Sequence, residues 1–157
     1  MKKMLLAALA AVTLIACSGE RDYLKVKGLS IGLAPKVFAD SMLNRGFQLD
    51  SAHSSETMMV FVRPDKPAYS VTMACDDKKI TAVEEDYRAT YNDSTRGLWQ
   101  ELRDGFVEEL GRQPGIPKRN DDHKIAEFET SEYKLVVTLD NRSVPFLSVF
   151  YEMKDEK

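Results

Sequence analysis

The sequence predicts an α+β fold in which an antiparallel meander sheet carries two helices packed on one face. Apolar residues recur at helical spacing in two segments, near residues 35–45 and 94–110. The segments that follow each of them alternate apolar and polar residues, as half-buried strands do. The connections between these strands are too short for parallel crossovers, so neighbouring strands must be antiparallel. A helix-then-strands unit therefore occurs twice, and both helices are expected to cover the same sheet face.

The first helix is predicted to begin at Pro35, because proline lacks the N–H group that would be unpaired in a first helical turn. Phe38 and Met42 contribute its apolar stripe. Gly46 supplies the left-handed residue that ends many helices. Before this helix, residues 24–31 are expected to form a strand that enters the domain.

Strands are predicted between the two helices, most clearly in segments 57–63, 68–75 and 79–89. Turns rich in proline and aspartate separate them. The last of these segments contains the acidic run Glu84-Glu85-Asp86, which we interpret as a solvated strand face or strand end.

The second helix is predicted from about Ser94 to Leu110, and its apolar stripe contains Trp99, the single tryptophan. We interpret Trp99 as a core residue rather than a ligand platform. Gly97 and Gly105 weaken this helix intrinsically, so packing must stabilise it. The alternative for Gly105 is that it permits a close approach to the sheet. After a polar loop, strands are predicted in segments 124–129, 133–139 and 144–153. The sheet face opposite the helices must then be partly solvated or used for binding.

The first seventeen residues have the order of parts found in an export signal. Two lysines precede an apolar run, Met4–Ala16. As a helix this run would span only ~20 Å, whereas the hydrocarbon core of a bilayer is ~30 Å thick. It suits a cleaved signal peptide better than a membrane-spanning helix, and Ala16 is the small residue that a signal peptidase needs beside the cut. An ordinary secretory signal with a chance cysteine nearby is the alternative.

The tetrad Leu14-Ile15-Ala16-Cys17 resembles the lipobox of bacterial lipoproteins. The resemblance implies that Cys17 is diacylated and becomes the first residue of the mature protein, which two acyl chains would anchor stably in a membrane. Ser18 is not the aspartate that retains such proteins on the inner membrane, so the outer membrane of the bacterial cell envelope is favoured. The expected organisation is a signal peptide over residues 1–16, a lipidated tether over 17–24 and a single domain over 25–157.

The charge balance limits the partners that are expected. The chain has 22 Lys and Arg residues against 25 Asp and Glu residues, and removal of residues 1–16, with two lysines and no acids, leaves a net charge of −5. Nonspecific binding to nucleic acid or to anionic lipid requires clustered cations. The pairs Lys78-Lys79 and Lys118-Arg119 are isolated, and we interpret them as solvated turn residues. We expect no nucleic-acid partner.

Segment 28–47, which runs from Gly28-Leu29-Ser30-Ile31 through Asn44-Arg45-Gly46-Phe47, resembles the opening helix unit of small envelope α+β domains. These include outer-membrane lipoproteins of the SmpA/OmlA type and the β-lactamase-inhibitor-like fold. The similarity supports the fold prediction. It transfers no activity, because this segment carries no catalytic residue.

No catalytic, metal or cofactor residue is predicted, since the sequence has no nucleophile elbow, Walker loop, CxxC or HExxH motif. If Cys17 carries lipid, Cys75 is the only thiol, and a buried, inert thiol is a better interpretation than a nucleophile. Asp121, Asp122 and His123 could donate to a metal, but adjacent residues rarely converge on one ion, so a solvated loop is favoured. For Asp76-Asp77, a turn is favoured over a calcium site.

Three functions remain open. The first is a lipid-anchored, non-enzymatic envelope protein that binds another envelope protein or supports assembly. The second, by fold analogy alone, is an inhibitor or sequestering protein that acts on a secreted enzyme, which a contiguous aromatic patch on the free sheet face would favour. The third is a hydrolase, which would require His123 and the scattered acids to converge in one cleft.

Overall fold

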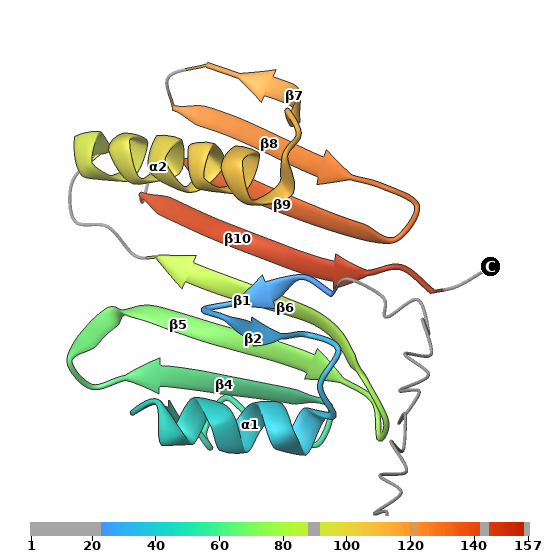
Figure 1. The fold of residues 1–157 in the computed structure, drawn as a ribbon. Coiled ribbons are helices and arrows are strands. Elements are labelled where there is room, and N and C mark those ends of the chain that lie inside the picture. The colour runs from blue at the N-terminus through green and yellow to red at the C-terminus, as the bar shows by residue number, and fades with distance from the viewer. Residues whose placement is uncertain (1–22, 88–91, 121, 142–144, 156–157) are drawn as a thin grey trace, which may run out of the picture.

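The computed structural model describes residues 23–87, 92–120, 122–141 and 145–155. It confirms an α+β fold made of two helices, a large antiparallel sheet and a small two-stranded sheet (Figure 1). In chain order the elements are β1 (Lys25–Val26), β2 (Leu29–Ser30), α1 (Pro35–Asn44), β3 (Gln48–Leu49), β4 (Met58–Arg63), β5 (Lys66–Cys75), β6 (Ile80–Tyr87), α2 (Asn92–Leu110), β7 (Gly115–Arg119), β8 (His123–Glu129), β9 (Tyr133–Asp140) and β10 (Phe146–Met153).

The large sheet has eight strands in the order β3-β4-β5-β6-β10-β9-β8-β7. Each half consists of one helix followed by four strands, and the halves join where β6 pairs with β10. Both helices lie on the same face, α1 over the β3–β5 side and α2 over the β8–β10 side (Figure 1). The strip of sheet between the helices is covered by the β1–β2 hairpin, whose Val26 and Leu29 belong to the buried core (Figure 1). The predicted helix-then-strands unit thus occurs twice.

Helix α1 forms as its sequence predicts. Pro35 occupies its first turn, and Phe38 and Met42 are fully buried against the sheet. Gly46 has a φ of 85°, and the N–H of Phe47 returns to the carbonyl oxygen of Met42 at 3.2 Å. This closure ends the helix and directs Phe47 into the core.

Helix α2 is tied to the second half of the sheet by Trp99, which is buried, as predicted. Its Nε1 donates a hydrogen bond to the carbonyl oxygen of Val137 at 3.1 Å. Phe106 packs edge-to-face against Phe128 and Tyr151. The alternative that Gly105 permits a close approach to the sheet was wrong, because a Cβ atom at this position would meet nothing within 4 Å. Neither helix of the described residues is long and apolar enough to cross a membrane.

Two segments differ from the prediction. Residues 24–31 form a hairpin instead of one strand, because Lys27 (φ 50°) and Gly28 (φ 77°) make a two-residue turn of the kind that matches strand twist. Leu24, the last residue of the expected tether, is buried, and its carbonyl oxygen accepts from the N–H of Ile31 at 3.0 Å. Strand β7 was missed because Pro114, directly before it, and Pro117 within it disrupt the strand pattern. It lies at the sheet edge, where Pro117 is tolerated.

The sheet face opposite the helices has half-buried side chains, as expected for a partly solvated face. Val60, Thr72, Glu84, Phe150 and Val136 lie side by side across five strands on this face. Burial, and then the charge of nearby Asp86, raises the pKa of Glu84. Within the run 84–86, Glu84 and Asp86 lie on this face, whereas Glu85 between them points the other way.

Candidate functional site: a cationic pocket above a buried carboxylate

Glu85 lies in the core of the protein, under the face that the helices cover. It is only 1% exposed and sits between Val71 of β5 and Val149 of β10, both fully buried. The interpretation of the run 84–86 as a solvated face was therefore wrong for Glu85. Strand alternation sends Glu84 and Asp86 to the open face and the carboxylate between them to the core.

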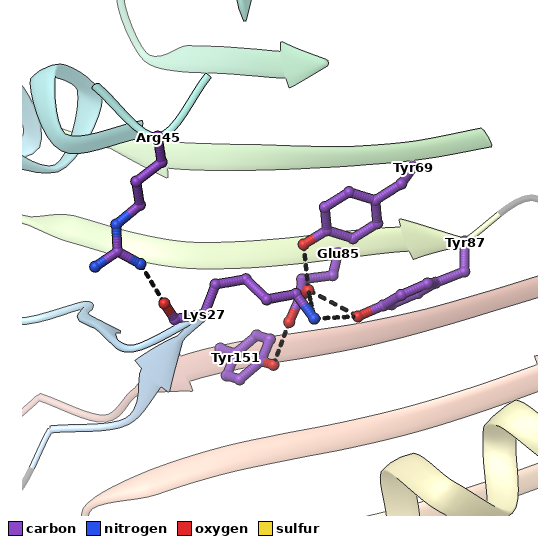
Figure 2. A network of polar contacts seen from close by, with 6 residues as sticks. All are labelled: Lys27, Arg45, Tyr69, Glu85, Tyr87 and Tyr151. Atoms are coloured by element: carbon purple, nitrogen blue, oxygen red, sulfur yellow. Dashed lines mark hydrogen bonds and ion pairs between the residues drawn. The ribbon is translucent and has the colours of Figure 1, made fainter. Parts of the chain in front are cut away.

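Four donors surround the Glu85 carboxylate (Figure 2). The hydroxyl of Tyr151 donates to Oε1 at 2.5 Å, and the hydroxyl of Tyr87 donates to Oε2 at 2.8 Å. Tyr69 donates a further short hydrogen bond to Oε2. The ammonium group of Lys27 lies 3.0 Å from the same oxygen and completes an ion pair. A buried charge needs this combination of hydrogen bonds and a counter-ion, because its desolvation is otherwise very unfavourable.

The three tyrosines remain hydroxyl donors throughout the physiological pH range. Burial, and then the neighbouring Glu85 carboxylate, raises the pKa of Tyr69, Tyr87 and Tyr151 well above its usual range. The rings of Tyr69 and Tyr87 lie 4.9 Å apart, and the Lys27 ammonium is 5.4 Å from the centroid of each. Lys27 therefore combines an ion pair with two cation–π contacts.

The position of Lys27 is set by the hairpin and by α1. Its backbone has a φ of 50°, in the turn between β1 and β2. Arg45, directly after α1, donates a short hydrogen bond from Nη1 to the Lys27 carbonyl oxygen (Figure 2). The Lys27 ammonium also donates to the Tyr87 hydroxyl at 2.8 Å. Lys27, at the tip of the hairpin, is thus held through both its backbone and its side chain.

A pocket of about 450 Å³ opens above this network. It is lined by four cationic and three aromatic side chains, which are Lys27, Arg45, Phe47, Arg63, Lys66, Tyr69 and Tyr87. We call it the cationic pocket. The cations come from the hairpin tip, the end of α1, the end of β4 and the start of β5. Its volume lies within the range of about 300–1,000 Å³ that is typical of small-molecule sites.

Two of the four cations are paired with carboxylates. Lys27 pairs with Glu85, and Arg63 donates two hydrogen bonds to Asp65, from Nε at 2.9 Å and from Nη2 at 2.8 Å. The Arg63 hydrogen bonds lower the pKa of Asp65, which stays ionised. No carboxylate within the described ranges lies at salt-bridge distance from Arg45 or Lys66.

The aromatic side chains of the pocket support Arg63. The guanidinium carbon of Arg63 lies 5.5 Å from the centroid of the Phe47 ring. The ring of Phe47 packs edge-to-face against that of Tyr69, with 6.0 Å between the ring centroids, and the Tyr69 ring contacts that of Tyr87. A positively charged opening therefore rests on a packed aromatic base, which suits recognition of an anion.

The pocket residues were missed because they are far apart in the sequence. Lys27, Arg45 and Lys66 are single cations in an acidic chain, and only the fold brings them to one opening. One signal was available in the sequence. Strand alternation places Tyr69, Glu85 and Tyr151 on the core-facing side of strands that the sequence predicts. Reading Glu85 with that register would have indicated a buried carboxylate near tyrosines.

The other candidates lie outside this site. Ala16, Cys17 and Asp121 are outside the described residues. Cys75 is a buried free thiol, as predicted, and its pKa is raised by burial and then by the carboxylates that follow it. Asp122 is exposed and accepts a hydrogen bond from Arg96 at 2.7 Å.

Asp76 confirms the predicted turn, since its Oδ1 accepts from the N–H groups of Lys78 and Lys79, each at 2.8 Å. Within the described part of the chain, no three His, Cys, Asp or Glu side chains form a group that could hold a metal ion.

Replacing Tyr151 with Phe should test the network. The change deletes one hydrogen bond to a buried charged group, which is worth about 1.5–3 kcal/mol, so Tyr151→Phe should lower the free energy of unfolding by that amount in a urea titration. Tyr133→Phe is the matched control, because Tyr133 is half-buried and its hydroxyl has no hydrogen-bond partner among the described residues. It should change the free energy of unfolding by less than about 0.5 kcal/mol. Equal effects would contradict a structural role for the Glu85 network.

Comparison with known proteins adds no relative. No family model matches the chain, and neither the curated proteins nor the solved structures include a significant match.

Proposed function

We propose that this protein is a lipid-anchored protein of the bacterial cell envelope that binds an anionic ligand in the cationic pocket without chemical conversion. The observation that carries the binding role is the convergence of Arg45 and Lys66, with no described carboxylate at salt-bridge distance, on one pocket of ligand size. The lipobox-like tetrad ending at Cys17 supports the anchor and the outer membrane as its location.

A binding role agrees with how the titratable groups of the site are used. The hydroxyls of Tyr69, Tyr87 and Tyr151 donate to Glu85, and Glu85 itself is paired with Lys27. General acid–base chemistry needs a group that can exchange a proton with a ligand near neutral pH. These groups instead form hydrogen bonds and an ion pair with one another. The network therefore serves as a fixed floor beneath the pocket.

Binding in the pocket has more support than an inhibitor role at the open sheet face. On the described part of that face, the aromatic side chains are Phe146 and Phe150, both on β10. A broad aromatic patch that spans several strands would have favoured docking to a secreted enzyme.

The anchor can be tested by the intact mass of the native protein extracted from membranes. We expect a chain that lacks residues 1–16 and carries the added mass of two acyl chains at its first residue. Cys17→Ser should abolish that mass. Cys75→Ser, which changes the buried thiol, should leave it in place. A native protein with an unmodified Cys17 and its leader still attached would contradict the proposed anchor.

Calorimetric titration of the detergent-solubilised full chain can test the pocket, with sodium citrate and sodium phosphate as probes at low ionic strength. At least one probe should bind saturably. The double variant Arg45→Gln/Lys66→Gln should weaken binding at least about 10-fold, since it removes charged hydrogen-bond donors. Lys78→Gln, at an exposed turn, is the control and should bind as the wild type does. Binding that is absent, or equally weakened in the control, would contradict the proposal.

A further inference from the structure

We infer that the cationic pocket recognises a phosphoryl group, specifically the dianionic end of a phosphate monoester. This inference rests on the proposed function and names the ligand class for the same site. It follows from the charge of the pocket, from the arrangement of its donors and from the position of Glu85 beneath it.

The charge of the pocket matches a dianion. Its four cations are opposed by two carboxylates, Glu85 under Lys27 and Asp65 beside Arg63, which leaves two positive charges in excess. A phosphate monoester carries a charge of about −1.5 to −2 at pH 7, whereas a single carboxylate carries −1. A phosphate monoester therefore neutralises the pocket and a simple carboxylate does not.

The donors approach from several segments of the fold. Arg45 uses Nη1 for the Lys27 carbonyl oxygen, which leaves Nε and Nη2 for a ligand. Arg63 uses Nε and Nη2 for Asp65, which leaves Nη1. Lys66, at the start of β5, is exposed and supplies an ammonium group. A planar carboxylate is satisfied by one arginine fork, whereas three tetrahedral phosphate oxygens can accept from donors on separate segments.

The base of the pocket limits how deep the ligand can go. Lys27 is held by Glu85 and by the Tyr87 hydroxyl, and the Glu85 carboxylate lies directly beneath it. An anion that displaced Lys27 would meet this buried negative charge. The phosphoryl group therefore binds at the opening, against Arg45, Arg63 and Lys66, and the rest of the ligand extends outward.

Such a phosphoryl group could belong to a free metabolite or to a membrane lipid. Lys27 follows Cys17 by ten residues, and an extended chain spans at most about 3.6 Å per residue, so the pocket would lie within ~36 Å of an acylated Cys17. The headgroups of the anchoring membrane are therefore within reach. The acidic balance of the chain argues against a broad lipid-binding surface, whereas the four cations of the pocket suit one specific headgroup.

The test titrates the full-length protein, held in lipid nanodiscs of phosphatidylcholine, with four soluble probes: inorganic phosphate, citrate, dihexanoyl phosphatidic acid and dihexanoyl phosphatidylcholine. Binding is followed by calorimetry at pH 7.5. We expect phosphate or phosphatidic acid to bind at least about 10-fold more tightly than citrate, and phosphatidylcholine not to bind. Tight binding of phosphatidic acid alone shows that the glycerol or acyl part is also recognised and favours a membrane headgroup, whereas tight binding of inorganic phosphate shows that the phosphoryl group suffices and favours a free phosphate.

Variants separate charge from geometry. Arg45→Gln and Lys66→Gln should each weaken phosphoryl binding about 10-fold, and Arg45→Lys, which keeps the charge but loses the fork, should also weaken it. Lys78→Gln is the control, and a cooperative thermal transition shows that each variant is folded. Citrate binding as tightly as both phosphoryl probes would overturn the phosphoryl assignment and leave the anion-binding function intact. Failure of every anionic probe would overturn both.

Discussion

The fold depends on one requirement, which is that a carboxylate buried in the middle of an eight-stranded sheet must have its charge satisfied by protein groups. Glu85 has apolar cross-strand neighbours on both sides, so its partners must come from elsewhere. Three tyrosines on its own face of β5, β6 and β10, and a lysine from the β1–β2 hairpin, supply them. Removing one partner from such a group is unfavourable, and this makes the position of the hairpin specific.

This requirement explains how the duplicated layout is completed. Two helix-then-strands halves place α1 and α2 on one face and leave a strip between them over β6, where they join (Figure 1). The hairpin covers that strip with Val26 and Leu29 and brings Lys27 to Glu85. Fixing Lys27 and the adjacent Arg45 also brings cations to the opening beside Phe47. The pocket is therefore a consequence of how the central strip is closed.

The sequence predicts those features whose causes are local. Pro35 and Gly46 mark the ends of α1, and the strand alternation around Cys75 places that thiol in the core. Strand alternation sets Glu85 on the inward face, but its burial was missed because an acidic run is normally solvated and because its partners are tyrosines and a lysine up to 66 residues away. The β1–β2 hairpin was missed because a turn with Lys27 at positive φ has no strong local signal. The cationic pocket depends on both, and it appears only when the tertiary structure is known.

A double-mutant cycle on Lys27 and Glu85 tests this account most directly. The free energy of unfolding is measured by urea titration for the wild type, Lys27→Met, Glu85→Gln and the double variant. Because the two side chains form an ion pair at 3.0 Å with the carboxylate buried, we predict a coupling energy between about 1 and 3 kcal/mol. Effects that add within about 0.5 kcal/mol would show that Lys27 does not stabilise the buried carboxylate, and would contradict the proposed cause of the fold and of its pocket.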